Sequence, residues 1–362
     1  MNLLNLWNSI ECYLFPHLED LLSTDLSKKE REFVRVCTLS ELERHTFDLE
    51  WQGLGRKSKD RLSILKAFIA KAVYNLDTTR SLINYLESSP TLRRLCGWEY
   101  KRNIPHESKF SRVFALIAEH KLCQRIHRAM IKAHCERRII GHLSRDSTAI
   151  EAREKVTILK ENKVKTPQKR GRPKNGEVRI KAKTVVEQQV DRSLEENIAN
   201  LSTHCNRGTK KNSNGYKISW KGYKLHLDCI DGDIPTTAIL TSASVHDSQV
   251  AIPLAQMSSQ RFHSLYDLMD AAYDSPSIHQ FSQKLGHRPI IDHNPRRGGQ
   301  KRTFEPLDKL RYNERSSAER VNSYLKDNYG GRNVRVKGHL KVMSHLMFGI
   351  IAITANQLFK LL

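Results

Sequence analysis

Apolar and polar residues follow two successive patterns along the chain, the first typical of helices and the second of strands. Over residues 1–50 leucines and other apolar residues recur at helical spacing, and the same holds from 62 to about 140 with a break at Pro90. We therefore expect a helical N-terminal segment over 1–50 and a helical region over 51–138, both ahead of the first strand.

From residue 139 onward, apolar runs of strand length predominate. The first strand should end near Asp146, and two alternating runs joined at Asp231-Gly232 predict a hairpin with a two-residue turn. Further elements are expected at 262–269 (strand), 275–285 (helix), 288–294 (strand), 306–327 (helix) and 340–362 (helix). An antiparallel trio of strands, extended by parallel strands and flanked by helices, is the arrangement of an α/β, ribonuclease-H-like fold.

A polar insertion at about residues 152–215 separates the first strand from the hairpin. Between Lys160 and Lys183 it holds ten basic residues and two acids, a composition typical of segments that bind a polyanion. Within it, Arg170 and Arg172 stand in an Arg-Gly-Arg-Pro stretch similar to an AT-hook, whose arginines enter the minor groove of A·T-rich DNA. A solvated basic linker explains the same residues equally well.

The charge balance indicates nucleic acid as a partner. The 362 residues include 61 lysines and arginines against 39 acids, a formal net charge of +22, and such a chain repels itself unless a polyanion neutralises it. A basic enzyme without a nucleic-acid partner is the alternative. Lys109 and Arg112 lie in the first turns of a helix that begins after Pro105, a placement that suits DNA contact but also a plain helical scaffold.

Compartment and membrane signals favour the cytoplasm. Seven cysteines are scattered without a Cys-x-x-Cys pair, which argues against a disulfide framework or zinc site and for a reducing compartment. The first residues lack the basic start of a signal peptide. The apolar run near the C-terminus is short and interrupted by Asn356 and Gln357, so we expect a buried helix packed on the sheet rather than a membrane span.

Three acids stand where a metal-dependent phosphodiester-cleaving site requires them. Two hard cations about 4 Å apart can activate the attacking oxygen and stabilise the leaving one, and Mg²⁺ prefers oxygen ligands. Asp146 and Asp270 each follow an apolar strand, while Glu319 lies on the long helix after the strands. Asp274 competes with Asp270 for the second position, but Asp270 follows its strand directly.

Glu319 shares one helix face with three other polar residues. At about 100° per residue, Arg315, Glu319 and Lys326 all fall within about 60° of Tyr312. Such a face suits a metal-bound carboxylate flanked by cations that hold phosphates. An ordinary i,i+4 ion pair would explain Arg315 and Glu319 alone.

This helix resembles the signature of DDE transposases encoded by bacterial insertion sequences, in the pattern Tyr312-x2-Arg315-x3-Glu319-x6-Lys326. Asp146, in Asp-Ser-Thr-Ala-Ile, and Asp270, in Asp-Ala-Ala-Tyr-Asp-Ser, resemble the first and second aspartates of that family. The resemblance covers roughly residues 50–362 and includes similar segments at 244–248, 336–338, 92–97 and 105–108. The first of these holds His246 and Asp247, which are candidates to support the carboxylates, with a plain polar loop as the alternative.

The resemblance implies a ribonuclease-H-like catalytic domain over 139–362, preceded by a helical DNA-binding domain over 51–138. It implies that Asp146, Asp270 and Glu319 hold two Mg²⁺ ions, for which Mn²⁺ can substitute. The basic insertion explains the 124 residues between the two aspartates. The 49 residues from Asp270 to Glu319 leave no room for the β-rich insertion of some relatives, so the sequence offers no support for hairpin-forming chemistry.

The implied partner is double-stranded DNA, first the terminal inverted repeats of a mobile element and then target DNA. By resemblance, a homodimer in a prokaryotic cytoplasm, at the nucleoid, uses metal-activated water to free a 3′-hydroxyl that then attacks the target. Arg315 and Lys326 would hold phosphates, and Tyr312 would contact DNA near the scissile bond. The alternatives are a ribonuclease-H-like nuclease without strand transfer, a non-catalytic transposase-derived DNA-binding protein, and a tyrosine recombinase.

Overall fold

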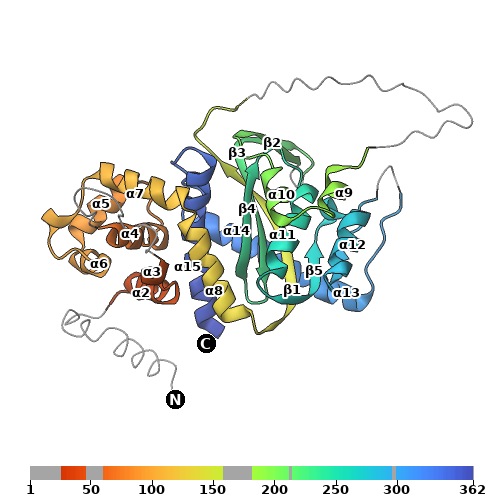
Figure 1. Ribbon diagram of the computed structural model, residues 1–362, viewed down its shortest axis with the longest axis horizontal. Helices are drawn as coiled ribbons and strands as arrows, with labels where there is room; N and C mark the ends of the chain where they lie inside the picture. The colour runs from red at the N-terminus through yellow and green to blue at the C-terminus, as the bar shows by residue number, and fades with distance from the viewer. Residues whose placement is uncertain (1–25, 46–59, 158–181, 212–213, 296–298, 362) are drawn as a thin grey trace, which may run out of the picture.

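The computed structural model describes residues 26–45, 60–157, 182–211, 214–295 and 299–361. Helices α2 to α7 gather on one side of the molecule and a mixed sheet with its flanking helices on the other, with α8 and α15 between them (Figure 1). Residues 1–25, which begin the expected N-terminal segment, lie outside the described residues, as do Arg170 and Arg172 of the basic insertion.

Every described element before the sheet is a helix. Ser27 and Glu30 form a capping box at the start of the first of them, Thr78 caps another, and Pro90 occupies a first helical turn. Gly97 ends that helix at a φ of 103°, a conformation that favours glycine. The elements are α2 (Lys28–Leu39), α3 (Leu42–His45), α4 (Arg61–Val73), α5 (Thr79–Ser88), α6 (Pro90–Cys96), η3 (Lys101–Asn103), α7 (Glu107–Glu119) and α8 (Leu122–Cys135).

One mixed sheet holds the strands β1 (Ile139–Glu151), β2 (Asn206–Lys211), β3 (Lys217–Ile230), β4 (Ile234–Ser242), β5 (His263–Met269) and β6 (Arg288–Ile291). Their order is β2-β3-β1-β5-β6, and β4 pairs with the second half of β3. Strand β1 is antiparallel to β3 and parallel to β5, which in turn is parallel to β6. This order is consistent with the predicted ribonuclease-H-like arrangement.

Two predicted details of the sheet region were wrong. Strand β1 does not end near Asp146 but continues five residues further, because its partner β3 stays paired with it. The hairpin turn has three residues, Asp231 to Asp233, since Gly232 and Asp233 both adopt positive φ and Arg320 holds the Asp233 carboxylate. The expected polar insertion also contains β2, α9 (Val185–Gln189) and α10 (Leu194–Ala199).

Helices cover the sheet after the hairpin: α11 (Ser248–Ser259), η4 (Ala271–Tyr273), α12 (Pro276–Lys284), α13 (Pro306–Tyr312), η6 (Asn313–Arg315), α14 (Ser316–Asn328) and α15 (His339–Leu361). The helix predicted over 306–327 is thus divided by a short 3-10 turn, and Tyr312 and Glu319 belong to different helices. Ser144 explains the division, because its hydroxyl donates to Arg315 O and accepts from the Ala318 N–H at the junction.

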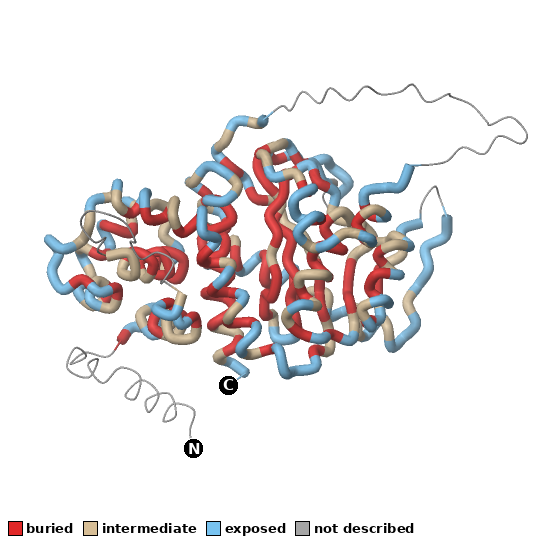
Figure 2. Tube along the Cα trace, viewed as in Figure 1, coloured by how far each residue is buried: buried red, intermediate tan, exposed pale blue. Residues whose placement is uncertain are grey.

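Helix α15 lies in the centre of the core that joins the helical region to the sheet (Figure 2). Its Phe348 ring lies 5.7 Å from the Phe68 ring of α4 and 6.2 Å from the Phe114 ring of α7, between centroids. By length and hydropathy alone α15 could cross a membrane, but 78% of its apolar window is buried inside the protein. It is therefore a core helix, as expected for the apolar run near the C-terminus.

Candidate active site

Asp146 and Asp270 follow the same stretch of parallel pairing between β1 and β5. That pairing reaches Ser144 opposite Leu268, and each aspartate lies two residues further along its chain. Burial, together with the charges of Asp270 and Glu319, raises the pKa of Asp146 to about 6. Burial also raises the pKa of Asp270. The fold therefore brings acids from two strands and a helix into one electrostatic environment.

Helix α14 is fixed on β1 by side chains next to these acids. Ser144 Oγ donates to Arg315 O over 2.6 Å and accepts from the Ala318 N–H over 3.4 Å. One turn later, Asn322 Nδ2 donates to Asp146 Oδ2 over 3.0 Å. Since Ser144 and Asp146 lie two residues apart on a strand, they point to the same face of the sheet. Ser144, which anchors the helix, and Asp146 thus lie on the same face of the sheet.

The Arg315 guanidinium lies among the candidate acids. Its Nη2 donates to Glu319 Oε1 over 2.6 Å, and its carbon lies 5.6 Å from the centroid of the Tyr312 ring. Burial lowers the pKa of Arg315, but Tyr312, Glu319 and Asp146 raise it overall. Its charge opposes the rise in pKa of both Asp146 and Asp270. Arg315 therefore partly neutralises the negative charge of the candidate acids.

The donor set of Asp146, Asp270 and Glu319 consists of carboxylate oxygens, which suits a hard divalent cation. In the present side-chain positions, no three His, Cys, Asp or Glu residues of the described chain lie close enough together to hold a metal ion. Glu319 explains this in part, because its side chain is 53% exposed and bound to Arg315. The chemistry of this donor set therefore suits a divalent cation, while in the present geometry Glu319 is bound to Arg315.

The contacts of Asp270 and Asp274 differ. Asp270 accepts a hydrogen bond from the Ala272 N–H over 2.9 Å at the start of η4. Asp274 bonds to His279 Nε2 over 3.1 Å and accepts from the Asn294 N–H over 3.0 Å, and these contacts lower its pKa despite partial burial. The Asp274 carboxylate is therefore engaged in joining α12 to the segment after β6, whereas the pKa of Asp270 is raised by burial and by the charges of Asp247 and Asp292.

Asp247 and His246 have different surroundings although they are neighbours. Asp247 Oδ1 accepts from Ser147 Oγ over 2.9 Å and from Lys224 Nζ over 3.0 Å. Its charge contributes to the raised pKa of Asp270. His246 is exposed, and its Nδ1 bonds only to the first residue of α11 within the described chain. Of the two, Asp247 is therefore the one whose charge raises the pKa of Asp270.

Sequence reasoning missed Arg145, the residue next to Asp146. Arg145 points to the opposite face of β1, and its Nε and Nη2 donate to the two oxygens of Asp228 over 2.7 and 2.8 Å. Its Nη1 contacts Met269 Sδ at 3.4 Å. Arg145, which precedes Asp146, is thus in contact with Met269, which precedes Asp270. The signal available in the sequence was a basic residue directly before the candidate Asp146.

Asn322 and Asp292 were also missed. Asn322 lies one turn after Glu319 and bonds to Asp146, a contact between residues 176 positions apart. Asp292 directly follows β6 and contributes to the raised pKa of Asp270, and its own carboxylate forms a 2.9 Å ion pair with Lys301. An acid directly after a parallel strand was the available signal for Asp292.

The predicted DNA-contacting residues lie in two places. Lys326, half-buried on α14, has its pKa lowered by burial and by the charges of Lys210 and Arg332, so it belongs to a basic group. Lys109 forms a 2.7 Å ion pair with the residue before α4, while Arg112 is exposed. Lys326 thus lies on the same helix as Glu319, seven residues further along.

Comparison with known families agrees with this geometry. Residues 146–355 match the family model described as Transposase DDE domain, and residues 18–116 match Transposase domain (DUF772). The second match begins before residue 50, where the sequence resemblance was expected to begin. No curated protein and no solved structure matches the chain. The first match covers more than half of the 362 residues, and the chain therefore belongs to the DDE transposases of insertion sequences, enzymes that bind DNA and transpose it by divalent-metal-dependent cleavage and strand transfer.

Proposed function

We propose that Asp146, Asp270 and Glu319 hold two Mg²⁺ ions, with Mn²⁺ as a substitute, beside the DNA strand to be cut. The observation that carries the proposal is Arg315, which bonds to Glu319 at 2.6 Å and also acts on both aspartates. The position of the Arg315 guanidinium supports a site in which the three carboxylates surround a positive charge. Bound divalent ions supply activation of the attacking oxygen and stabilisation of charge at the phosphate.

The neighbouring side chains then bind and position the DNA. Arg315 exchanges Glu319 for a phosphate, to which a guanidinium can donate two parallel hydrogen bonds. The Tyr312 ring packs against that guanidinium, and the side chain contacts the DNA strand. Lys326 neutralises a phosphate further along α14, and Asn322 orients the Asp146 carboxylate. Each role rests on the position of the side chain along the consecutive elements α13, η6 and α14.

The proposed substrates are the terminal inverted repeats of the mobile element and then target DNA, bound by a homodimer. The net charge of +22 supports contact over a large DNA surface. In this proposal residues 51–138 bind DNA, with the exposed Arg112 among the contacts, and residues 139–362 catalyse the reaction. The role of residues 1–50 stays open. The setting is the nucleoid in a prokaryotic cytoplasm.

The test replaces each acid by its amide: Asp146→Asn, Asp270→Asn and Glu319→Gln. Each variant should lose cleavage of DNA carrying the inverted repeats in Mg²⁺, and keep binding to it, because only the metal ligand is removed. Glu314→Gln, at an exposed acid in the adjacent turn, is the matched control and should cut normally. A joining assay with labelled DNA ends then measures strand transfer. Wild-type cleavage by Glu319→Gln overturns the ligand assignment.

A further inference from the structure

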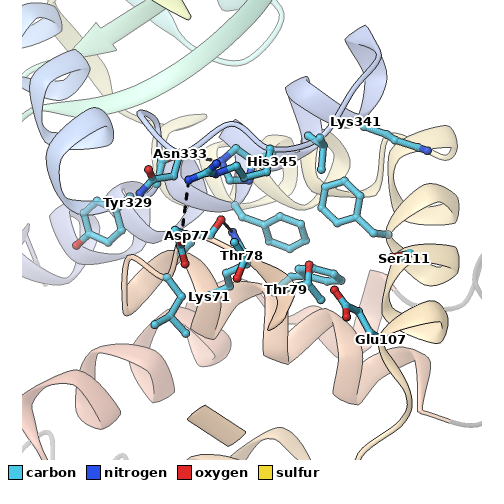
Figure 3. A pocket seen from close by; sticks show the side chains of 18 of the residues that line it. Lys71, Asp77, Thr78, Thr79, Glu107, Ser111, Tyr329, Asn333, Lys341 and His345 are labelled. Carbon is cyan, nitrogen blue, oxygen red and sulfur yellow. Dashed lines mark hydrogen bonds and ion pairs between the residues drawn. The ribbon is translucent and has the colours of Figure 1, made fainter. Parts of the chain in front are cut away.

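A pocket of about 460 Å³ lies between the helical region and the loop that joins α14 to α15. Figure 3 shows Asp77 and Glu107 on one wall and Asn333 and Lys341 on the other. The volume is in the range of small-molecule sites. The pocket is separate from the carboxylates, and neither the matched families nor the proposed site assigns it a role.

Three phenylalanines form the apolar floor of the pocket. The ring of Phe68 lies 4.9 Å from that of Phe114 and 5.7 Å from that of Phe348, measured between centroids, and all three side chains are buried. The Phe114 and Phe348 rings are tilted by 63° and 32° against that of Phe68, so the three form an apolar floor against which a base can pack.

The rim and one wall of the pocket carry positive charge. Lys71 is 8% exposed, and within the described chain its ammonium donates one hydrogen bond, to Asp77 O over 3.3 Å. Burial lowers the pKa of Lys71 to about 8, so it is still mostly charged at neutral pH. Lys337 and Lys341 are exposed and form no ion pair with any residue that the structure describes. A buried, under-satisfied cation calls for an anionic ligand.

The two acids that line the pocket already have partners. Glu107 forms a 2.7 Å ion pair with Arg80, and Asp77 lies 3.9 Å from Arg335 and accepts a hydrogen bond from Ser81. These pairs leave the lysines to dominate the charge of the open space. The pocket is therefore suited to a ligand with a planar ring and a phosphate.

The pocket lies at the far end of the helix that carries Glu319. From Glu319 to Tyr329, which lines the pocket, α14 and its end span about 15 Å at 1.5 Å per residue. Lys326 lies along this path and Arg332 lies three residues beyond Tyr329, and the two charges act on each other electrostatically. Since a DNA strand advances about 3.4 Å per nucleotide, the pocket is about four or five nucleotides from the carboxylates.

We propose that this pocket binds one unstacked nucleotide of the DNA strand that passes the carboxylates, with its base on the phenylalanine floor and its phosphate beside Lys71, Lys337 and Lys341. The proposal rests on the transposase function and adds a DNA contact outside the catalytic site. Apolar contact with the floor offsets part of the loss of stacking within the DNA. A free mononucleotide has the same chemistry, but the basic path from the carboxylates favours a DNA strand.

The test uses photocross-linking of the full chain to a single-stranded oligonucleotide in which 5-iodouracil replaces thymine, in EDTA so that no cleavage occurs. Cross-links should map to peptides that contain the floor residues. Ser111→Trp, at an exposed position lining the pocket, should fill it and weaken cross-linking by about tenfold, the size expected for the loss of one base contact. Glu119→Trp, exposed on the same helix outside the pocket, should cross-link normally.

A second pair of variants tests the phosphate contact. Lys341→Gln should weaken cross-linking, whereas Lys360→Gln, exposed at the other end of the same helix, should not. Cross-links that map elsewhere, or a Ser111→Trp protein that cross-links normally, overturn the proposal. Binding of thymidine 5′-monophosphate in the pocket without binding of the oligonucleotide also overturns the proposal.

The two proposals fail separately. The Asp146→Asn protein should keep the cross-link although it has lost cleavage, because the pocket does not include the carboxylates. If the acid variants cut normally and the cross-link persists, the metal-ligand assignment fails and the pocket stands. If the acid variants are inactive and the cross-link is absent, the pocket fails and the ligand assignment stands.

Discussion

Arg145 and Asp228 lie directly opposite each other in neighbouring strands and form a bidentate ion pair, with no more than 1% of either side chain exposed. Ser258 Oγ donates a third hydrogen bond to Asp228 over 2.7 Å. Because Arg145 also contacts Met269, the pair ties together three strands just before Asp146 and Asp270. The spacing of the two candidate ligands thus depends on a buried charge pair on the opposite face of the sheet.

Breaking this pair should destabilise the protein strongly. Arg145→Met leaves the Asp228 carboxylate buried and unpaired, which should lower the free energy of unfolding by about 3–5 kcal/mol in denaturant titrations. Adding Asp228→Leu should restore most of that loss. Lys132→Met removes an exposed pair with Glu136 and should change stability by at most about 1 kcal/mol. A small effect of Arg145→Met would show that solvent reaches Asp228.

Asp146 should make the metal-free protein less stable as pH rises. Its pKa is raised by burial from 3.8 to about 6 in the folded protein, so its favourable contribution is fully present below about pH 3.8 and is lost as pH rises through about 6. Asp146→Asn should therefore exceed the wild type in stability by about 1–3 kcal/mol at pH 7, and by little at pH 4. Buried His127 and His226 titrate in both proteins, so the difference between the proteins isolates Asp146. Equal stability at pH 7 would contradict the prediction.

Removing the cation beside Glu319 should favour metal binding. In Arg315→Gln the acids lose their protein counterion, and Mn²⁺ should bind about tenfold more tightly, as followed by thermal shift against metal concentration. Cleavage should still fall, because the phosphate contact is lost. Arg320→Gln, on the same helix but bound to Asp233, is the control with unchanged metal affinity. Weaker Mn²⁺ binding by Arg315→Gln would mean that the arginine supports the ligands.

Lys326 should contribute one phosphate contact. Lys326→Gln should reduce the slope of log affinity against log salt concentration by about one, since one fewer counterion is released on binding. Lys284→Gln, at an exposed position of α12, should leave the slope unchanged. The measurement is DNA binding by fluorescence anisotropy over a salt series. An unchanged slope for Lys326→Gln places this lysine away from the DNA backbone.

Much of the fold was predictable because its signals are local. Apolar periodicity indicated the helices before β1, and the runs that became β3, β4 and β5 were short and bounded by turn residues. The predictions went wrong where distant residues intervene. Pairing with β3 extends β1 past Asp146, and Ser144 divides the predicted long helix by bonding into it. Neither the extension of β1 nor the division of the helix can be predicted from the sequence of the altered segment alone.

The sequence by itself determined the chemistry available to this transposase: three acids in order, the helix signature that surrounds Glu319, and an excess of positive charge. These properties follow from residue type and short spacing. Only the tertiary structure decided that Arg315 bonds to Glu319 among the acids, that Asn322 holds Asp146, and that Arg145 pairs with Asp228. The Arg315–Glu319 bond is a local i,i+4 pair, and its place among the acids is what tertiary packing sets; the other two contacts join residues 176 and 83 positions apart, so no local pattern predicts them.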